Sequence, residues 1–237
     1  MTLKEYRTYF NENLSDLYPQ TEIDSFFFLL IEEFLSIQRI DYSLNPDFEI
    51  EEAKVDLLNY ALKRLQNEEP LQYIVGKTEF YGLPFIVNKH VLIPRPETEE
   101  LVEWIISTVI TNESDTSLKI LDIGTGSGCI PTALKKNLPN AAISAIEVSK
   151  NALDIAKKNS DINKTEINFI QKDILETNDL DQQFDIIVSN PPYVRELEKQ
   201  EIKNNVLENE PHLALFVEDN NPLLFYDKIA DLAKTSL

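Results

Sequence analysis

The sequence predicts an α/β fold, in which a parallel sheet carries helices on its faces, preceded by a small helical domain. Three observations support this prediction. Short β-branched runs such as Leu118 to Ile123 and Phe184 to Val188 alternate with segments of helical periodicity. Three of the five glycines of the chain lie between Gly124 and Gly128, directly after the first of these runs. A proline-rich loop, Asn190 to Tyr193, directly follows the second.

The composition is that of an ordinary globular protein. Hydrophobic residues make up 43% of 237 residues, enough for one large domain or two small ones. No apolar run approaches the length of a membrane span and the N-terminus lacks a secretion signal, so we expect a cytoplasmic protein without membrane attachment. One cysteine and two histidines argue against a disulfide framework and a structural metal site. The net charge of −19 opposes tight binding to DNA or RNA.

Residues 1–72 show the pattern of a helical domain. A capping-box pattern begins at Thr2 and a similar one at Thr21. Apolar residues recur at helical spacing from Ile23 to Leu35, and a third helix is expected from about Glu51 to Gln66.

Residues 73–93 are expected to form a β-hairpin that links the two domains. Its turn lies at Gly82, and its last extended run is Val91 to Ile93. Residues 94–237 then form the α/β domain.

The first helix of the α/β domain is predicted from Glu100 to about Ile110, with Thr98 as its N-terminal cap. Trp104 lies within this amphipathic segment. We therefore expect its indole to be part of the hydrophobic core.

The glycine cluster is expected to bring the backbone close to a ligand. Gly124, Gly126 and Gly128 follow a predicted strand and precede a helix that extends to Leu138, in whose first turn Pro131 is tolerated. Cys129 is expected to be a small core residue at the start of that helix. Alone, a glycine-rich turn is only weak evidence for a nucleotide-like ligand. Its spacing is G-x-G-x-G, which differs from the dinucleotide fingerprint G-x-G-x-x-G.

Two acidic residues follow the next predicted strands. Glu147 ends the strand that begins at Ala142, about twenty residues after the glycines, where an acid can accept hydrogen bonds from ribose hydroxyls. Ser149 is predicted to cap the helix that follows Glu147. Asp173 comes after a strand from Ile167 to Gln171 and is a candidate acceptor for an adenine amino group.

The loop Asn190-Pro191-Pro192-Tyr193 is the candidate catalytic element. Two prolines end the preceding strand in a stiff loop that lacks two backbone N–H donors. The Asn190 side-chain oxygen and the Pro191 carbonyl can therefore accept both hydrogens of a substrate –NH2, and Tyr193 can stack on the flat group that carries it. The alternative is a structural turn without a ligand.

The remaining segment contains two further expected elements. The polar run from Arg195 to Asn209 is expected to form a helix or a mobile flap. Residues 214–217 are predicted to be the fifth strand of the sheet, and a helix from Pro222 or Leu223 closes the chain.

With these residues placed, the chain resembles the peptide chain release factor glutamine methyltransferases, the HemK/PrmC family. The glycine turn is common to many methyltransferases, whereas the Ile93–Glu99 segment joined to an N-terminal helical domain is more specific. The matching segments, which span most of the chain, are residues 70–76, 80–82, 91–99, 121–128, 188–194, 210–211 and 214–215.

The resemblance implies a Rossmann-like class I methyltransferase domain that uses S-adenosylmethionine and yields S-adenosylhomocysteine. It implies that the methyl acceptor is the glutamine side-chain nitrogen in the Gly-Gly-Gln motif of release factors, and that the helical domain helps to dock that partner. The implied cofactor-binding residues are Asp122, Gly124, Thr125, Gly126, Gly128, Glu147, Asp173, Ile174 and Asn190. The implied glutamine-binding residues are Asn190, Pro191, Pro192 and Tyr193, of which Asn190, Pro191 and Tyr193 are the catalytic candidates.

One departure from the family is expected. Its sheet has seven strands, whereas this chain ends after the helix that follows the predicted fifth strand. By usual strand and loop lengths, the two absent strands correspond to about 40 residues. We therefore expect a shortened catalytic domain with an exposed strand edge and reduced stability. Separately, we expect the protein to be a monomer.

Three other functions remain open. An adenine-N6 methyltransferase of DNA or RNA suits the same loop but is disfavoured by the negative charge. A nicotinamide-dependent oxidoreductase is disfavoured by the glycine spacing. A non-catalytic methyltransferase shell is the third.

Overall fold

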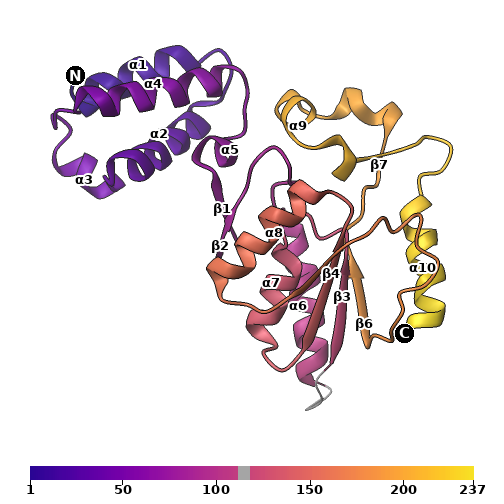
Figure 1. Cartoon of the computed structure of the whole chain (residues 1–237). Coiled ribbons are helices and arrows are strands. Elements are labelled where there is room, and N and C mark those ends of the chain that lie inside the picture. The colour runs from indigo at the N-terminus through magenta and orange to yellow at the C-terminus, as the bar shows by residue number, and fades with distance from the viewer. Residues whose placement is uncertain (112–117) are drawn as a thin grey trace. The chain divides into compact units, whose positions relative to one another are not determined.

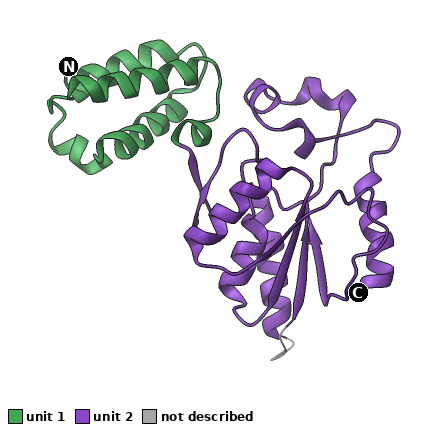
Figure 2. Ribbon diagram, in the orientation of Figure 1, with its two compact units in different colours: residues 1–75 green, residues 76–237 purple. Residues whose placement is uncertain are grey.

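The computed structural model describes residues 1–111 and 118–237 and divides into two compact units, Met1–Val75 and Gly76–Leu237 (Figure 2). The hairpin predicted as a linker belongs to the second unit. No helix among the described residues has both the length and the apolar character needed to cross a membrane.

The first unit is built from helices around one apolar core (Figure 1). Its elements are α1 (Leu3–Leu14), α2 (Gln20–Leu35), α3 (Arg39–Leu44), α4 (Glu52–Gln66) and α5 (Leu71–Val75). The Thr2 capping box is confirmed, since Thr2 and Glu5 exchange side-chain to backbone hydrogen bonds. The predicted cap at Thr21 is wrong. The second helix begins at Gln20 after Pro19, and Asp24 instead pairs with Arg7 at 2.8 Å.

The second unit contains a short hairpin and a parallel sheet. β1 (Lys77–Phe80) and β2 (Leu83–Ile86) pair antiparallel. The sheet has the order β5-β4-β3-β6, with all neighbours parallel, from β3 (Lys119–Ile123), β4 (Ala142–Glu147), β5 (Asn168–Gln171) and β6 (Ile186–Ser189). The helices are α6 (Pro96–Thr111), α7 (Cys129–Asn137), α8 (Lys150–Asn163), α9 (Asn204–Asn209) and α10 (Leu224–Ser236).

Residues alternate between the two faces of the sheet, and each face has its own core. Ile120 and Val188 pack with α6, α7 and the hairpin phenylalanines. Leu121 and Ile123 pack instead with α10 and the segment that contains Ile174. The sheet is therefore covered on both sides, and its ligand-accessible edge is the one where the parallel strands end.

The predicted fifth strand does not join this sheet. Only Phe216–Val217, β8, is extended, and it pairs with β7, Val194–Arg195, directly after the Asn-Pro-Pro-Tyr loop. The 3₁₀ turn at His212–Ala214 takes up the start of the predicted strand, so only Phe216 and Val217 are left to pair with a neighbouring strand. The sheet thus contains four strands within the described residues.

Two further predictions are wrong. Residues 91–93 form no strand, although Val91 and Ile93 are buried. Trp104 is 70% exposed, because α6 turns Val102, Ile105 and Ile106 toward the core. Trp104 lies on the other side of the helix.

Candidate active site

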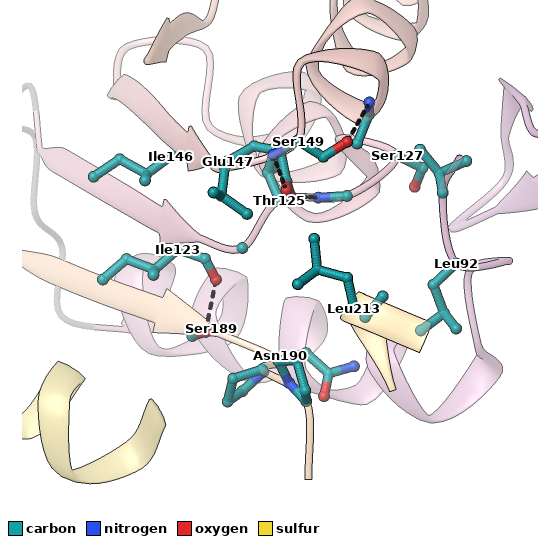
Figure 3. A pocket seen from close by; sticks show the side chains of 18 of the residues that line it. Leu92, Ile123, Thr125, Ser127, Ile146, Glu147, Ser149, Ser189, Asn190 and Leu213 are labelled. Atoms are coloured by element: carbon teal, nitrogen blue, oxygen red, sulfur yellow. Dashed lines mark hydrogen bonds between the residues drawn. The ribbon is translucent and has the colours of Figure 1, made fainter. Parts of the chain in front are cut away.

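A pocket lies at the edge where the parallel strands end, within the second unit (Figure 3). Three loops border it: the glycine loop after β3, the segment after β4 and the loop after β6. Glu147 and Thr125 lie on one side of the pocket and Asn190 on the opposite side. Among the other lining residues are Leu92, Arg95, Thr98, Asp173, Ile174, Pro191, Pro192, Leu213, Phe225 and Ile229.

The glycine loop is held by the end of β4. The backbone N–H groups of Gly124 and Thr125 both donate to the Ile146 carbonyl, at 2.9 and 3.1 Å. The N–H of Gly126 donates to Glu147 Oε2 at 2.9 Å. Strand β4 and its terminal acid therefore fix the shape of the loop.

Glu147 is buried, and each of its oxygens accepts one backbone hydrogen bond. Its Oε1 accepts from Ser149 N–H at 2.9 Å, while Oε2 accepts from Gly126. Each carboxylate oxygen has a second lone pair that can accept from a ligand. The predicted Ser149 cap is confirmed, since its hydroxyl accepts from Ala152 N–H.

Asp122 lies within β3 and is fully buried. Neither of its carboxyl oxygens has a hydrogen-bond partner among the described residues, nor do the buried hydroxyls of Thr125 and Thr132. Burial raises the pKa of Asp122 to about 7, and the negative charge of Glu147 acts in the same direction. Buried polar atoms without partners of this kind mark a place where water or a ligand group can bind.

The raised pKa predicts a pH-dependent penalty for folding. The unfolded chain releases the Asp122 proton near pH 4 and the folded chain near pH 7, so the folded state binds more protons in between. Stability therefore falls as the pH rises through this window. Relative to Asp122→Asn, the wild type should lose about 2 kcal/mol of unfolding free energy between pH 5.5 and pH 8.5.

Urea unfolding of both proteins at several pH values measures this difference. Asp154→Asn, at an exposed position on α8, controls for the loss of one carboxylate. If the difference in unfolding free energy between the wild type and Asp122→Asn stayed constant with pH, the prediction would be contradicted.

The loop after β6 is attached to both of its neighbours. The Ser189 hydroxyl donates to the Ile123 carbonyl at 2.6 Å, which ties the base of this loop to the base of the glycine loop. Asn190 Nδ2 donates to the Thr98 hydroxyl of α6 at 3.2 Å. No described residue donates to Asn190 Oδ1 or to the backbone carbonyls of Asn190 and Pro191. The loop thus offers a group of available acceptors beside the pocket.

The structure brings most of the predicted site residues to one pocket, but not all of them. Gly124, Thr125, Gly126, Glu147, Asp173, Ile174, Asn190, Pro191 and Pro192 line it. Asp122 and Gly128 do not: Asp122 is buried within β3, and Gly128 is the N-cap residue of α7. Tyr193 is 60% exposed and also lies outside the lining.

No pattern in the sequence predicts the ion pair that fixes Arg95 at the pocket. Arg95 forms an ion pair with Glu210 at 2.6 Å, and the Ile93 N–H donates to the other Glu210 oxygen at 3.2 Å. The Glu210 side chain is 1% exposed, so this pair joins two segments more than a hundred residues apart. Both residues lie in segments that the sequence analysis matched to the family, but no pattern pairs them.

The described residues contain no group of three His, Cys, Asp or Glu side chains that could hold a metal ion. Cys129 is a core residue, as predicted, and burial raises the pKa of its thiol to about 12. It is therefore a thiol at neutral pH.

The chain matches two family models. Residues 5–76 match the PrmC N-terminal domain, and residues 103–214 match the Methyltransferase small domain.

Curated relatives match over nearly the whole chain. The release factor glutamine methyltransferase of Flavobacterium psychrophilum is 55% identical over 237 residues, which are 100% of this chain and 83% of that protein. The protein of the same name from Bacteroides thetaiotaomicron is 43% identical over 97% of this chain and 81% of its own length.

Solved structures share the fold at low sequence identity. The hMettl16 catalytic domain, in complex with an RNA hairpin, aligns with a TM-score of 0.52 at 17% identity and covers 95% of this chain and 72% of that one. This likeness confirms the class of fold predicted for the α/β domain.

Proposed function

The chain belongs to the release factor glutamine methyltransferase family, and from this premise we propose that it methylates the side-chain amide nitrogen of a glutamine in peptide chain release factors. The methyl donor is S-adenosylmethionine. The observation that carries the proposal is that Asn190 and Pro191, whose acceptors no described residue engages, line the same pocket as the glycine loop.

The residues on the glycine side of the pocket fit S-adenosylmethionine. Gly124 and Gly126 have no atom within 4 Å of the place where a side chain would begin, so a ligand can approach their backbone. Glu147 can accept from ribose hydroxyls, and Asp173 with Ile174 can hold the adenine. The Thr125 hydroxyl, which lines the pocket and has no hydrogen-bond partner among the described residues, also suits a polar ligand group. When bound, S-adenosylmethionine supplies an electrophilic methyl group on a sulfonium.

The residues on the other side of the pocket act on the glutamine. An amide nitrogen is a poor nucleophile because its lone pair is delocalised into the carbonyl. Asn190 Oδ1 and the Pro191 carbonyl can each accept one hydrogen of the –NH2 group, which raises its electron density and fixes its direction. The same acceptors stabilise positive charge that develops on the nitrogen. The substrate nitrogen loses one of its hydrogens as a proton to water after the N–C bond has formed and the nitrogen has become cationic, so no group of the chain has to remove it before the attack.

The experiment is transfer of radiolabelled methyl from S-adenosylmethionine to a purified release factor. We expect label on the release factor and none on the same factor with alanine in place of the Gly-Gly-Gln glutamine. DNA and RNA serve as competing acceptors, because the same loop suits an adenine amino group. Label on nucleic acid with none on the release factor would reject the proposal in favour of the adenine-N6 reaction.

A further inference from the structure

We propose that Thr98 is a positioning residue that holds the Asn190 side-chain amide at the place where its oxygen can face the substrate. The inference deepens the proposed function and rests on it. Thr98 lies in the first turn of α6 and its side chain is buried, with 8% exposure. Its hydroxyl is 3.2 Å from Asn190 Nδ2, across 92 residues of sequence.

The two ends of an Asn amide have opposite roles. Oδ1 accepts hydrogen bonds and Nδ2 donates them, while the terminal torsion of the side chain is broad and roughly two-fold. A rotated Asn190 would direct hydrogens at the hydrogens of a substrate –NH2. The chemistry proposed for the loop therefore requires one of the two orientations.

Thr98 supplies the contact that holds the amide in place. Its hydroxyl can donate as well as accept, so the substrate –NH2, which only donates, selects the orientation, while Thr98 fixes the position. It is the only described residue that forms a hydrogen bond with the Asn190 side chain. With Nδ2 donating to the Thr98 hydroxyl, Oδ1 is left to accept from the substrate, together with the Pro191 carbonyl. Without the hydroxyl, no side-chain hydrogen bond from a described residue holds the amide in that position.

The fold gives Thr98 a fixed position for this role. Its backbone N–H donates to the Arg95 carbonyl at 3.0 Å, and Arg95 is itself paired with Glu210. The loop that carries Asn190 is independently fixed by Ser189, which donates to the Ile123 carbonyl. Both partners of the contact are thus attached to the sheet and its neighbouring helix, as positioning requires.

The test compares Thr98→Val, which keeps the β-branched shape and removes the hydroxyl, with Thr98→Ser, which keeps the hydroxyl. For Thr98→Val we expect kcat for release factor methylation to fall about tenfold, because a misdirected acceptor loses positioning. The dissociation constant for S-adenosylmethionine should change less than about twofold, and Thr98→Ser should recover most of the wild-type kcat. Equal kcat in the Val variant and the wild type, or equal losses in the Val and Ser variants, would overturn the proposal.

A second readout needs no turnover. The Asn190 side-chain amide signal in a ¹H–¹⁵N spectrum, assigned by its loss in Asn190→Ala, reports the hydrogen bond directly. Its exchange with solvent should be about fivefold faster in Thr98→Val than in the wild type or Thr98→Ser, as expected for one lost hydrogen bond. Unchanged exchange would overturn the positioning role even if the wild type proved inactive on release factors. A purely structural Thr98 would lower the melting temperature and leave kcat and exchange unchanged.

Discussion

Asn190→Ala should lower kcat for methyl transfer by about 100- to 1000-fold, the loss typical when one preorganised polar contact to a reacting group is removed. The substitution deletes Oδ1, for which no described residue competes, and leaves the Pro191 carbonyl in place. One hydrogen of the substrate amide then has no acceptor, and its nitrogen is free to rotate away from the methyl donor. Affinity for S-adenosylmethionine should fall much less, within about tenfold, because the glycine loop and Glu147 lie on the opposite side of the pocket.

Single-turnover methylation separates chemistry from binding, and calorimetry gives the cofactor affinity. Asn137→Ala is the matched control, since Asn137 is exposed at the end of α7 and donates only to the Ala133 carbonyl. It should turn over like the wild type. A rate for Asn190→Ala within threefold of wild type would show that the loop is a structural turn, the alternative that the sequence left open.

The polar residues of the pocket could be predicted from the sequence because they lie at the ends of parallel strands. Parallel strands end at one edge of a sheet, so Glu147, Asp173 and Asn190 meet there whatever the exact strand boundaries are. The glycine loop follows the same rule, because it comes directly after β3. These predictions needed only the order of strands and turns.

Side-chain contacts between distant segments were not predictable in this way. Thr98 has the residue type of a helix cap, but α6 begins two residues earlier, so its hydroxyl is available for Asn190. Glu210 carries no local signal for its pairing with Arg95. The amphipathic character of its segment predicts Trp104 in the core, but the positions of Val102, Ile105 and Ile106 decide which side of the helix is buried. Tertiary packing determined all three.

Gly128→Ala should destabilise the second unit by about 3–5 kcal/mol, more than Gly124→Ala, for which about 1–2 kcal/mol is expected from backbone strain alone. The two glycines have the same φ of +76°, so both variants place an L-residue in the left-handed region. They differ in their surroundings. A Cβ at Gly128 would lie 3.0 Å from Ala156 Cβ and 3.1 Å from Ala156 Cα, whereas a Cβ at Gly124 meets no atom within 4 Å.

Ala156 is fully buried on α8, and its Cα can move only if that helix shifts. Relieving the close contact at Gly128 therefore lowers the free energy of unfolding substantially, since protein interiors are close-packed. Urea unfolding gives both free energies. The double variant Gly128→Ala, Ala156→Gly should be less destabilised than the sum of the two single variants by about 1 kcal/mol, because it removes one of the two close contacts. Equal destabilisation by Gly128→Ala and Gly124→Ala would contradict this packing argument.

Ligand affinity should rank the same two variants in the opposite order. Gly124 lines the pocket, so its new methyl group would occupy space that the proposed S-adenosylmethionine needs, and affinity should fall at least about tenfold in the folded protein. Gly128 lies outside the lining, so its variant should bind within about threefold of wild type at temperatures where it remains folded. Gly124→Ala should therefore weaken binding more, and Gly128→Ala should lower stability more. Backbone strain or general destabilisation alone would not produce these opposite orders. The comparison thus distinguishes the glycine that leaves room for a ligand from the glycine that lets α7 approach α8.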